Sequence, residues 1–119
     1  MKTNTYKDLF VWQKSYELVK EIYFVTKSFP KDEQYGIISQ MRRAAIAIPS
    51  NIAEGYGRNS RKDYSRFCSI AYGSLLELET QLNLSIDLKF TTTTSVLRAN
   101  QLIVEVTKML YVLINKLNA

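Results

Sequence analysis

The sequence predicts an all-α protein, an antiparallel up-down-up-down four-helix bundle with left-handed packing. Three observations indicate this fold class. Apolar residues recur at three- and four-residue steps in four separate segments, no stretch alternates with the two-residue period of a strand, and short turn sequences separate the segments. We expect one domain over residues 1–119, with helices at roughly 8–27, 32–56, 61–89 and 95–117.

The first helix is predicted from about Asp8 to Lys27. Its apolar residues, with Ser15 as the one polar member, form two lines within one broad face: Val11, Ser15, Leu18, Ile22 and Val25, and Trp12, Tyr16, Val19 and Tyr23. The helix should end before Pro30, because proline disfavours helical geometry in the residue that precedes it. Asp32 is then expected to cap the second helix.

The stretch from Gly36 to Gly57 forms most of the second predicted helix. One stripe along it has the core-facing pattern of an amphipathic helix: Ile37, Met41, Ala44, Ala45, Ile48 and Ile52. Pro49 lacks a backbone donor and crowds the carbonyl of Ala45, so we expect a kink there. The helix should end at Gly55 or Gly57, because glycine tolerates the left-handed backbone that closes a helix.

The third and fourth helices are predicted on either side of a run of threonines, Thr91 to Thr94, which favours a turn. Ser60 is the expected N-cap of the third helix, with Asp63 three residues on, close to a capping box. Its core line is Tyr64, Cys68, Ala71, Leu75, Leu78, Leu82 and Ser85. The fourth helix has a coiled-coil-like line: Val96, Ala99, Ile103, Val106, Leu110, Leu113 and Leu117.

The composition is that of a soluble globular domain, with 46% hydrophobic and 23% charged residues. No apolar run approaches the ~20 residues that span a bilayer, and the N-terminal sequence lacks the apolar segment of a signal peptide. We therefore expect a cytoplasmic protein with no membrane partner. Cys68 is the single cysteine, so no internal disulfide can form, and its helical neighbours predict a small core residue.

Apolar residues are left over after the core is assigned. They form two rows: Tyr35, Ile46 and Ala53 in the second predicted helix, and Leu97, Val104 and Tyr111 in the fourth. Every folded surface shows some apolar atoms. Spaced rows on two helices nevertheless favour a homo-oligomer in which helices of adjacent subunits pack through these residues.

The basic residues concentrate at one predicted turn. The chain has a net charge of +5 and a pI near 9.4. The strongest constellation is Arg58, Arg61, Lys62 and Arg66, opposed only by Asp63. An antiparallel bundle brings Lys2, Lys7 and Lys116 to the same end. These cations could contact phosphates without reading base sequence, and the nearby Tyr56 and Tyr64 could stack on bases.

Two alternatives to nucleic-acid contact stay open for the basic residues. The turn could be a solvated helix start, although cations at a helix N-terminus oppose the helix dipole. Arg42 and Arg43 form a second candidate site for nucleic acid. For them a salt bridge between helices or subunits is favoured, with Glu54, Glu77 or Glu79 as the partner.

Residues for catalysis are scarce. The sequence has no histidine, one cysteine and no phosphate-binding loop, so the usual nucleophile–base pairs and zinc sites are missing. Glu77 and Glu79 are two apart on a helix and face different ways, unlike a catalytic carboxylate pair. We expect no enzyme, no cofactor and no metal. A small-molecule pocket in the bundle has no supporting polar constellation.

The segments LFVWQKSYELVKEIYFVT, SQMRRAAIAIPSNIAEG and DYSRFCSIAYGSLLELETQL resemble the 23S rRNA-intervening-sequence proteins, also called the four-helix-bundle protein family. The resemblance covers nearly the whole chain. It implies an antiparallel four-helix bundle that assembles as a homopentamer. It also implies kinship with the accessory protein of diversity-generating retroelements, a similar pentamer whose basic surface binds nucleic acid and a reverse transcriptase.

The resemblance supplies no activity, because the family is named for the location of some of its genes. The leading hypothesis is a non-enzymatic oligomeric bundle whose basic surface binds RNA or DNA, with a reverse transcriptase as a protein partner. The alternative is a purely structural or protein-interaction module that does not bind nucleic acid. In that case the apolar rows build the assembly and the basic turn keeps it soluble.

Overall fold

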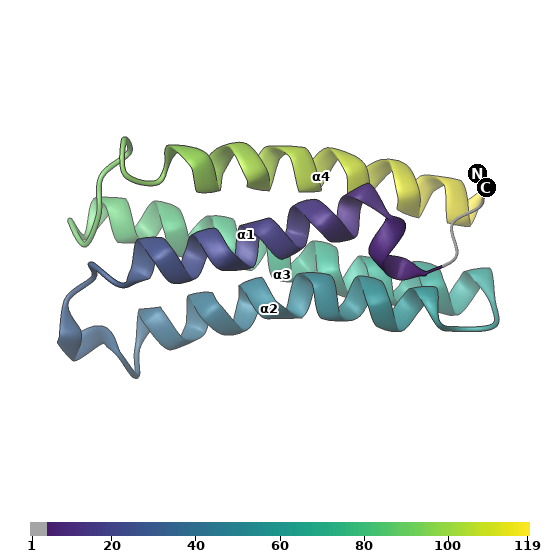
Figure 1. Ribbon diagram of the computed structural model, residues 1–119, viewed down its shortest axis with the longest axis horizontal. Helices are drawn as coiled ribbons and strands as arrows, with labels where there is room; N and C mark the ends of the chain where they lie inside the picture. Colours follow the sequence, from purple (N-terminus) through teal and green to yellow (C-terminus); the bar gives the residue numbers. More distant parts are fainter. Residues whose placement is uncertain (1–4) are drawn as a thin grey trace.

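The computed structural model of the chain describes residues 5–119, and these residues form α-helices and no strands. The four helices lie side by side along the long axis (Figure 1), as the sequence predicted. They are α1 (Phe10–Thr26), α2 (Ile37–Tyr56), α3 (Arg61–Asp87) and α4 (Leu97–Asn118), with short 3-10 helices η1 (Tyr6–Asp8) and η2 (Lys31–Glu33) before α1 and α2.

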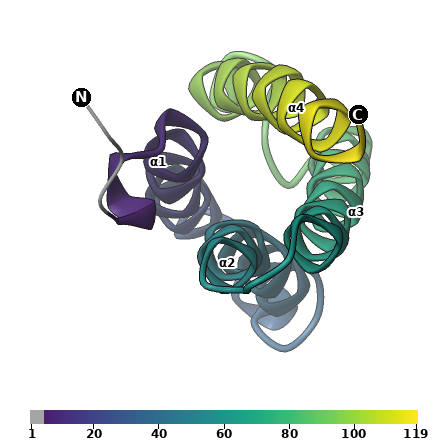
Figure 2. The same ribbon diagram turned by 90° about the vertical axis from the view of Figure 1, so that its right-hand side faces the viewer.

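Each helix packs against two others: α1 contacts α2 and α4, and α3 contacts α2 and α4. The α1–α2 and α3–α4 connections lie at one end of the molecule, and the α2–α3 connection lies at the other, beside the C-terminus (Figure 1). Figure 2 looks along the helices and shows them arranged around a common centre. The bundle measures 43 × 24 × 22 Å. The left-handed twist stays a prediction.

The core is built from one buried stripe on each helix. The largest side chains in it are fully enclosed: Leu18, Ile22, Met41, Ile48, Ile52, Leu75, Leu78, Leu82, Val96, Leu102, Ile103 and Leu110. The first predicted line of α1, from Val11 to Val25, and the line of α3 are buried as expected, apart from Tyr64, which is half-buried. The second line of α1 is not buried: Trp12 and Val19 are half-buried, and Tyr16 and Tyr23 are exposed. In α4 the line holds as far as Leu110, whereas Leu113 and Leu117 are half-buried and Leu102 is an additional core residue. Burial of this apolar surface is the main force that opposes chain entropy.

The start of α2 differs from the prediction. The helix begins at Ile37 instead of Asp32, because residues 31–33 form η2 and Gly36 then bends the chain before the helix. A Cβ atom at Gly36 would lie 2.7 Å from the Glu33 Oε1 atom, but that atom is the end of a flexible side chain and can move aside, so the contact does not by itself require a glycine. Ile38 is consequently the buried residue of the first turn, and Ile37 is half-buried. Tyr35 lies before the helix and is 94% exposed.

The end of α2 also differs from the prediction in one respect, the conformation of Gly57. The helix ends at Tyr56, but Gly57 has a φ of −78°, so it does not adopt the left-handed conformation predicted for a closing glycine. Gly55 is buried inside the helix, where a Cβ would lie 2.9 Å from Phe67 Cβ. Its role is therefore to let α2 approach α3 closely. Helical structure continues on both sides of Pro49.

The boundaries of α3 and α4 follow the sequence signals. The Ser60 hydroxyl accepts a hydrogen bond from the backbone N–H of Asp63 at 3.1 Å, which confirms the predicted N-cap. The helix ends at Asp87, two residues before the predicted end, and Lys89 has a left-handed φ of 66°. The threonine run separates α3 from α4, where the Thr92 hydroxyl accepts a hydrogen bond from the backbone N–H of Ser95 at 3.1 Å.

The α2–α3 and α1–α4 contacts differ in extent, and the α1–α4 contact also includes ion pairs. Contact between α2 and α3 is the most extensive of the helix pairs. Ion pairs join α1 to α4: Lys14 to Glu105 at 3.4 Å, and Arg98 to Glu17 at 3.0 Å. All four of these side chains are substantially solvent-exposed, so each pair adds little to stability.

Candidate functional site

The basic turn (Arg58, Arg61, Lys62 and Arg66) lies where α2 ends and α3 begins. The Arg58 Nη2 atom pairs with Glu54 Oε2 at 2.8 Å. The guanidinium groups of Arg58 and Arg66 both lie over the ring of Phe67, at 4.7 and 4.5 Å from its centroid. Arg66 also lies 4.0 Å from Asp63. Two arginines are thus oriented by one aromatic ring.

Arg61 reaches across to the last turn of α4. Its Nη2 atom donates a hydrogen bond to the backbone carbonyl of Lys116, and the Ser65 hydroxyl donates to Asn118 Oδ1 at 2.7 Å. The guanidinium of Arg61 therefore lies at the negative end of the α4 dipole, and Arg58 follows the negative end of α2. These placements offset the unfavourable dipole expected for cations at the start of α3.

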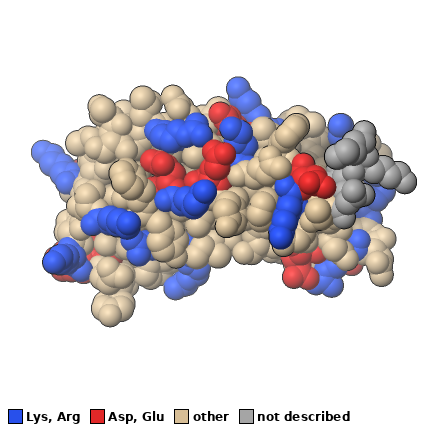
Figure 3. Space-filling model, in the orientation of Figure 1, with Lys and Arg blue, Asp and Glu red and all other residues tan. Residues whose placement is uncertain are grey.

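The basic turn leaves one of its cations without an internal partner. The Lys62 side chain forms no ion pair or hydrogen bond within residues 5–119. Lys116 lies at the same end, and η1, which contains Lys7, lies toward it as well (Figure 1). Lys2 lies outside the described residues. On the face shown in Figure 3, lysine and arginine reach both ends of the molecule, and acidic side chains lie beside some of them.

The two tyrosines near the basic turn pack against each other. The rings of Tyr56 and Tyr64 meet edge to face, with centroids 6.0 Å apart, and Tyr64 packs against the core. Burial raises the pKa of Tyr64 to about 12. Tyr64 therefore contributes to the α2–α3 contact, and Phe67 is the aromatic ring that Arg58 and Arg66 cover.

Arg42 and Arg43 have different surroundings although they are adjacent in sequence. Arg42 is half-buried, its Nε atom donates a hydrogen bond to Thr26 Oγ1 at 3.0 Å, and its guanidinium lies 4.4 Å from the centroid of Tyr23. Arg43 is exposed. The expected salt bridge between helices is not formed within the described chain: Glu54 pairs with Arg58, and Arg42 contacts α1. A salt bridge between subunits stays a prediction.

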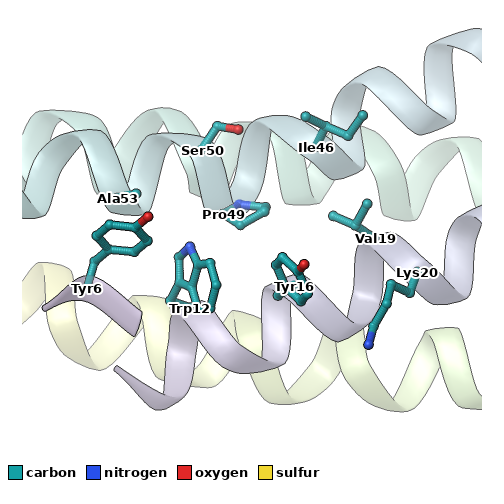
Figure 4. Close-up of a pocket in the computed structure, with 9 residues that line it drawn as sticks. All are labelled: Tyr6, Trp12, Tyr16, Val19, Lys20, Ile46, Pro49, Ser50 and Ala53. Atoms are coloured by element: carbon teal, nitrogen blue, oxygen red, sulfur yellow. The ribbon is translucent and has the colours of Figure 1, made fainter. Parts of the chain in front are cut away.

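An aromatic groove lies between α1 and α2 (Figure 4). Its volume is about 440 Å³, and its lining residues are Tyr6, Trp12, Tyr16, Val19, Lys20, Ile46, Pro49, Ser50 and Ala53. The rings of Tyr6, Trp12 and Tyr16 follow one another at centroid distances of 5.3 and 4.9 Å. Two predicted interface residues, Ile46 and Ala53, therefore form one wall of a larger apolar surface.

The groove contains residues that the sequence prediction assigned to the core. Trp12, Tyr16 and Val19 belong to the second apolar line of α1, and this line is only partly covered by the fold, with Tyr16 49% exposed. The signal was present in the sequence, because a face with two apolar lines is broader than one neighbouring helix covers. Tyr35, by contrast, is not among the residues that line the groove.

The second apolar row is exposed as predicted. Leu97, Val104 and Tyr111, here called the α4 row, are 54%, 50% and 60% exposed. They lie on three successive heptads of one helix. Tyr111 also lines a shallow hollow with Tyr72 and Ile114, between α3 and α4. The two predicted interface rows thus lie on different apolar surfaces: Ile46 and Ala53 line the groove between α1 and α2, and the α4 row lies on α4.

Cys68 is buried, and burial raises the pKa of its thiol to about 11. We expect it to react with a thiol reagent at near-neutral pH at least roughly a hundredfold more slowly in the folded chain than in the unfolded chain, because the enclosed sulfur is inaccessible to the reagent and less thiolate is present. The free energy of unfolding should also depend on pH. The raised pKa values of Cys68 and Tyr64 stabilise the fold below their unfolded values, and this contribution is lost as pH rises through the folded values.

Alkaline denaturation followed by circular dichroism checks this expectation. Cys68→Ala should remove the part of the decline that begins near pH 9 and leave a smaller part due to Tyr64, because burial is the main cause of the raised Tyr64 pKa and the Cys68 thiolate is a lesser one. Equal thiol reactivity in folded and unfolded chains, or a decline unchanged in Cys68→Ala, would contradict it.

The fold and the surfaces define a compact all-α bundle with a basic turn at one end, an aromatic groove between α1 and α2 and an exposed apolar row on α4. Among residues 5–119, no three His, Cys, Asp or Glu side chains gather where they could hold a metal ion. None of the helices in this part of the chain has the length and apolar character to cross a bilayer. The family model described as 23S rRNA-intervening sequence protein matches residues 7–112, and the chain belongs to this family. No curated protein matches the chain.

Proposed function

We propose that the chain is the non-enzymatic subunit of a cytoplasmic homo-oligomer whose basic end binds RNA or DNA. Its helices would follow the up-down-up-down order with a left-handed twist. The observation that carries the proposal is the gathering of Arg58, Arg61, Lys62 and Arg66 at one end of the bundle, where Glu54 and Asp63 are the acidic partners. Four cations with two carboxylates give this end an excess of positive charge.

The internal contacts of the basic turn are compatible with phosphate binding. An arginine has five N–H donors, and the internal contacts described for each arginine here use only part of that set. Phe67 and the carbonyl of Lys116 hold the guanidinium groups in place, so less side-chain entropy is lost when a phosphate binds. Contacts of this kind would bind the backbone without reading base sequence.

The exposed apolar surfaces support self-association. The aromatic groove and the α4 row have different shapes and lie on different helices, so the economical contact is heterologous, with the groove of one copy against the row of the next. A heterologous contact closes into a ring when its rotation allows. The pentamer, the kinship with the retroelement accessory protein and the reverse transcriptase as partner are proposals suggested by the resemblance described above.

A salt titration of nucleic-acid binding tests the basic turn. We expect the chain to bind a mixed oligonucleotide at low ionic strength, with an affinity that falls as salt is added. Replacing Arg58, Arg61, Lys62 and Arg66 together by glutamine should reduce the slope of log affinity against log salt by about 3 to 4, if all four contact phosphates. Fluorescence anisotropy measures both quantities.

A matched control carries four glutamines elsewhere, at Lys14, Lys89, Arg98 and Lys108, and so has the same net charge. Its slope should change by less than about 1, because charges remote from the contact act only through screened potentials. Circular dichroism confirms that both variants are folded. Absence of binding at low ionic strength, or equal slopes for the two variants, would remove the basic turn as the nucleic-acid site.

A second candidate function is a structural or protein-interaction module. The observation that favours it is that three of the four cations of the basic turn already have partners within the chain. This module would be indifferent to nucleic acid, and its protein partner would be recovered by pull-down from the native cell even after nuclease treatment. Loss of every partner on nuclease treatment would instead favour the nucleic-acid function.

A further inference from the structure

A second basic site lies at the opposite end of the molecule from the basic turn, beside the α1–α2 connection (Figure 1). It is a pocket of about 440 Å³, here called the cationic pocket. Its lining residues are Thr26, Lys27, Phe29, Lys31, Gln34, Ile38 and Arg42. Three of these seven residues are cations and none is acidic, so the pocket has a positive charge with no carboxylate in its lining.

Arg42 is held in a fixed orientation at this pocket. Its Nε–H donates to Thr26 Oγ1 at 3.0 Å, and the Thr26 hydroxyl in turn donates to the backbone carbonyl of Ile22 at 2.7 Å. Thr26 is fully buried, and its proton is committed to Ile22, so the hydroxyl oxygen can only accept from Arg42. The ring of Tyr23 covers the guanidinium at 4.4 Å. The side chain is therefore positioned before any ligand binds.

The acidic residues close to the pocket in sequence do not neutralise it. Glu33 Oε1 accepts a weak hydrogen bond, at 3.4 Å, from the backbone N–H of Ile37. Asp32 is exposed. Within the described chain, neither residue forms an ion pair with Lys27, Lys31 or Arg42. A half-buried guanidinium whose Nη atoms have no acceptor within residues 5–119 has donors available for an anion.

We propose that the cationic pocket binds a phosphate group. The planar fork of Arg42 would contact two phosphate oxygens, and Lys27 and Lys31 would supply point charges. Phe29 and Ile38 are buried and form an apolar floor, next to which an ion pair is stronger than in open water. The source of the phosphate is either the free anion or a nucleic-acid backbone, and only the second source rests on the function proposed above.

Calorimetric titration of the full-length protein with inorganic phosphate at low ionic strength tests the pocket. We expect saturable binding. Arg42→Gln should weaken it by about tenfold or more, because a charge-assisted hydrogen-bonded contact is lost. Arg43→Gln removes the same charge from the next residue, which is exposed and does not line the pocket, and it should weaken binding by less than about twofold.

Two further variants separate positioning from charge. Arg42→Lys keeps the positive charge but loses the fork, so its affinity should lie between those of the wild type and Arg42→Gln. Thr26→Val removes the acceptor that orients Arg42 and should weaken phosphate binding while every charge is retained. Absence of saturable phosphate binding, or equal losses in Arg42→Gln and Arg43→Gln, would overturn the proposal.

Parallel titration with a short single-stranded oligonucleotide identifies the source. If Arg42→Gln weakens binding of both phosphate and the oligonucleotide, the pocket takes a backbone phosphate. If it weakens phosphate binding alone, the pocket takes the free anion, and nucleic acid binds elsewhere. Oligonucleotide binding that depends on the basic turn, without any phosphate binding at Arg42, would overturn the pocket and leave the proposed function in place.

Discussion

Replacing Gly55 by valine is expected to lower the free energy of unfolding by about 3 kcal/mol, because the site cannot hold a branched side chain without moving a helix. A Cβ at this position would lie 2.9 Å from Phe67 Cβ and 3.1 Å from the backbone carbonyl oxygen of Tyr64. A carbonyl on a helix backbone cannot turn aside as a flexible side chain can. Urea denaturation at fixed protein concentration measures the loss.

Gly73 provides the control for this experiment. It is exposed within α3, and a Cβ there would have no neighbour within 4 Å. Gly73→Ala should therefore stabilise the chain by about 0.5 to 1 kcal/mol through helix propensity alone. Gly55→Ala should destabilise it, because even one methyl group meets Phe67 and Tyr64. If both alanine variants shift stability in the same direction, close packing at Gly55 does not hold α2 against α3.

Replacing Ile46 by glutamate is expected to convert the proposed oligomer into a monomer of 13.8 kDa. Ile46 is 43% exposed and lines the aromatic groove, so association would bury a carboxylate with no partner there. The cost of such burial should weaken association by at least about a hundredfold. Light scattering coupled to size-exclusion chromatography measures the mass. A wild-type chain that is already monomeric at micromolar concentration would remove the assembly proposal.

Ile70 provides a matched control on another helix. It is the same residue type, also 43% exposed, but it lies on α3 outside the groove and outside the α4 row. Ile70→Glu should leave the mass of the assembly unchanged. If it disrupts the assembly and Ile46→Glu does not, the contact between copies uses α3.

Mixing two variants that no longer self-associate distinguishes a heterologous interface from an isologous one. In a heterologous interface, Ile46→Glu damages the groove and Val104→Glu damages the row, so each variant keeps the surface that the other lacks. Together they should form a one-to-one pair and nothing larger. In an isologous interface that uses either surface alone, the mixture would contain no such pair.

The fold could be predicted because the apolar repeat of each helix is continuous. The line from Val11 to Val25 is buried along α1, and the Ser60 cap marks the start of α3 as expected. The errors occur at helix ends, where the backbone conformation of single residues decides where a helix begins or ends. The pattern predicted a helix from Asp32, but Gly36 turns the chain first, so α2 begins at Ile37. Propensity alone does not show which glycine bends a chain and which one packs in a helix.

The candidate site was predicted in part, for a similar reason. Composition placed the cations of the basic turn in one segment, and the structure keeps them at one end of the bundle. Their partners could not be predicted: Arg61 contacts a carbonyl 55 positions away, and Arg42 bonds to Thr26 on the preceding helix. Such contacts depend on the rotation of each helix about its axis. Of the cations in the cationic pocket, only Arg42 was a candidate from the sequence. Lys27 and Lys31 were not, because the three cations are spread over residues 27–42, on either side of a turn.

The contacts between neighbouring helices differ in strength, and this difference suggests where the bundle deforms first. The hairpin of α2 and α3 is locked by close backbone approach at Gly55, which ions in solution do not affect. The junction of α1 and α4 has the least extensive contact of the four helix pairs, and its exposed ion pairs, Lys14–Glu105 and Arg98–Glu17, add little to stability and are weakened further by dissolved salt. We therefore expect α2 and α3 to stay packed together as a rigid pair. Partial opening of the bundle would begin between α1 and α4.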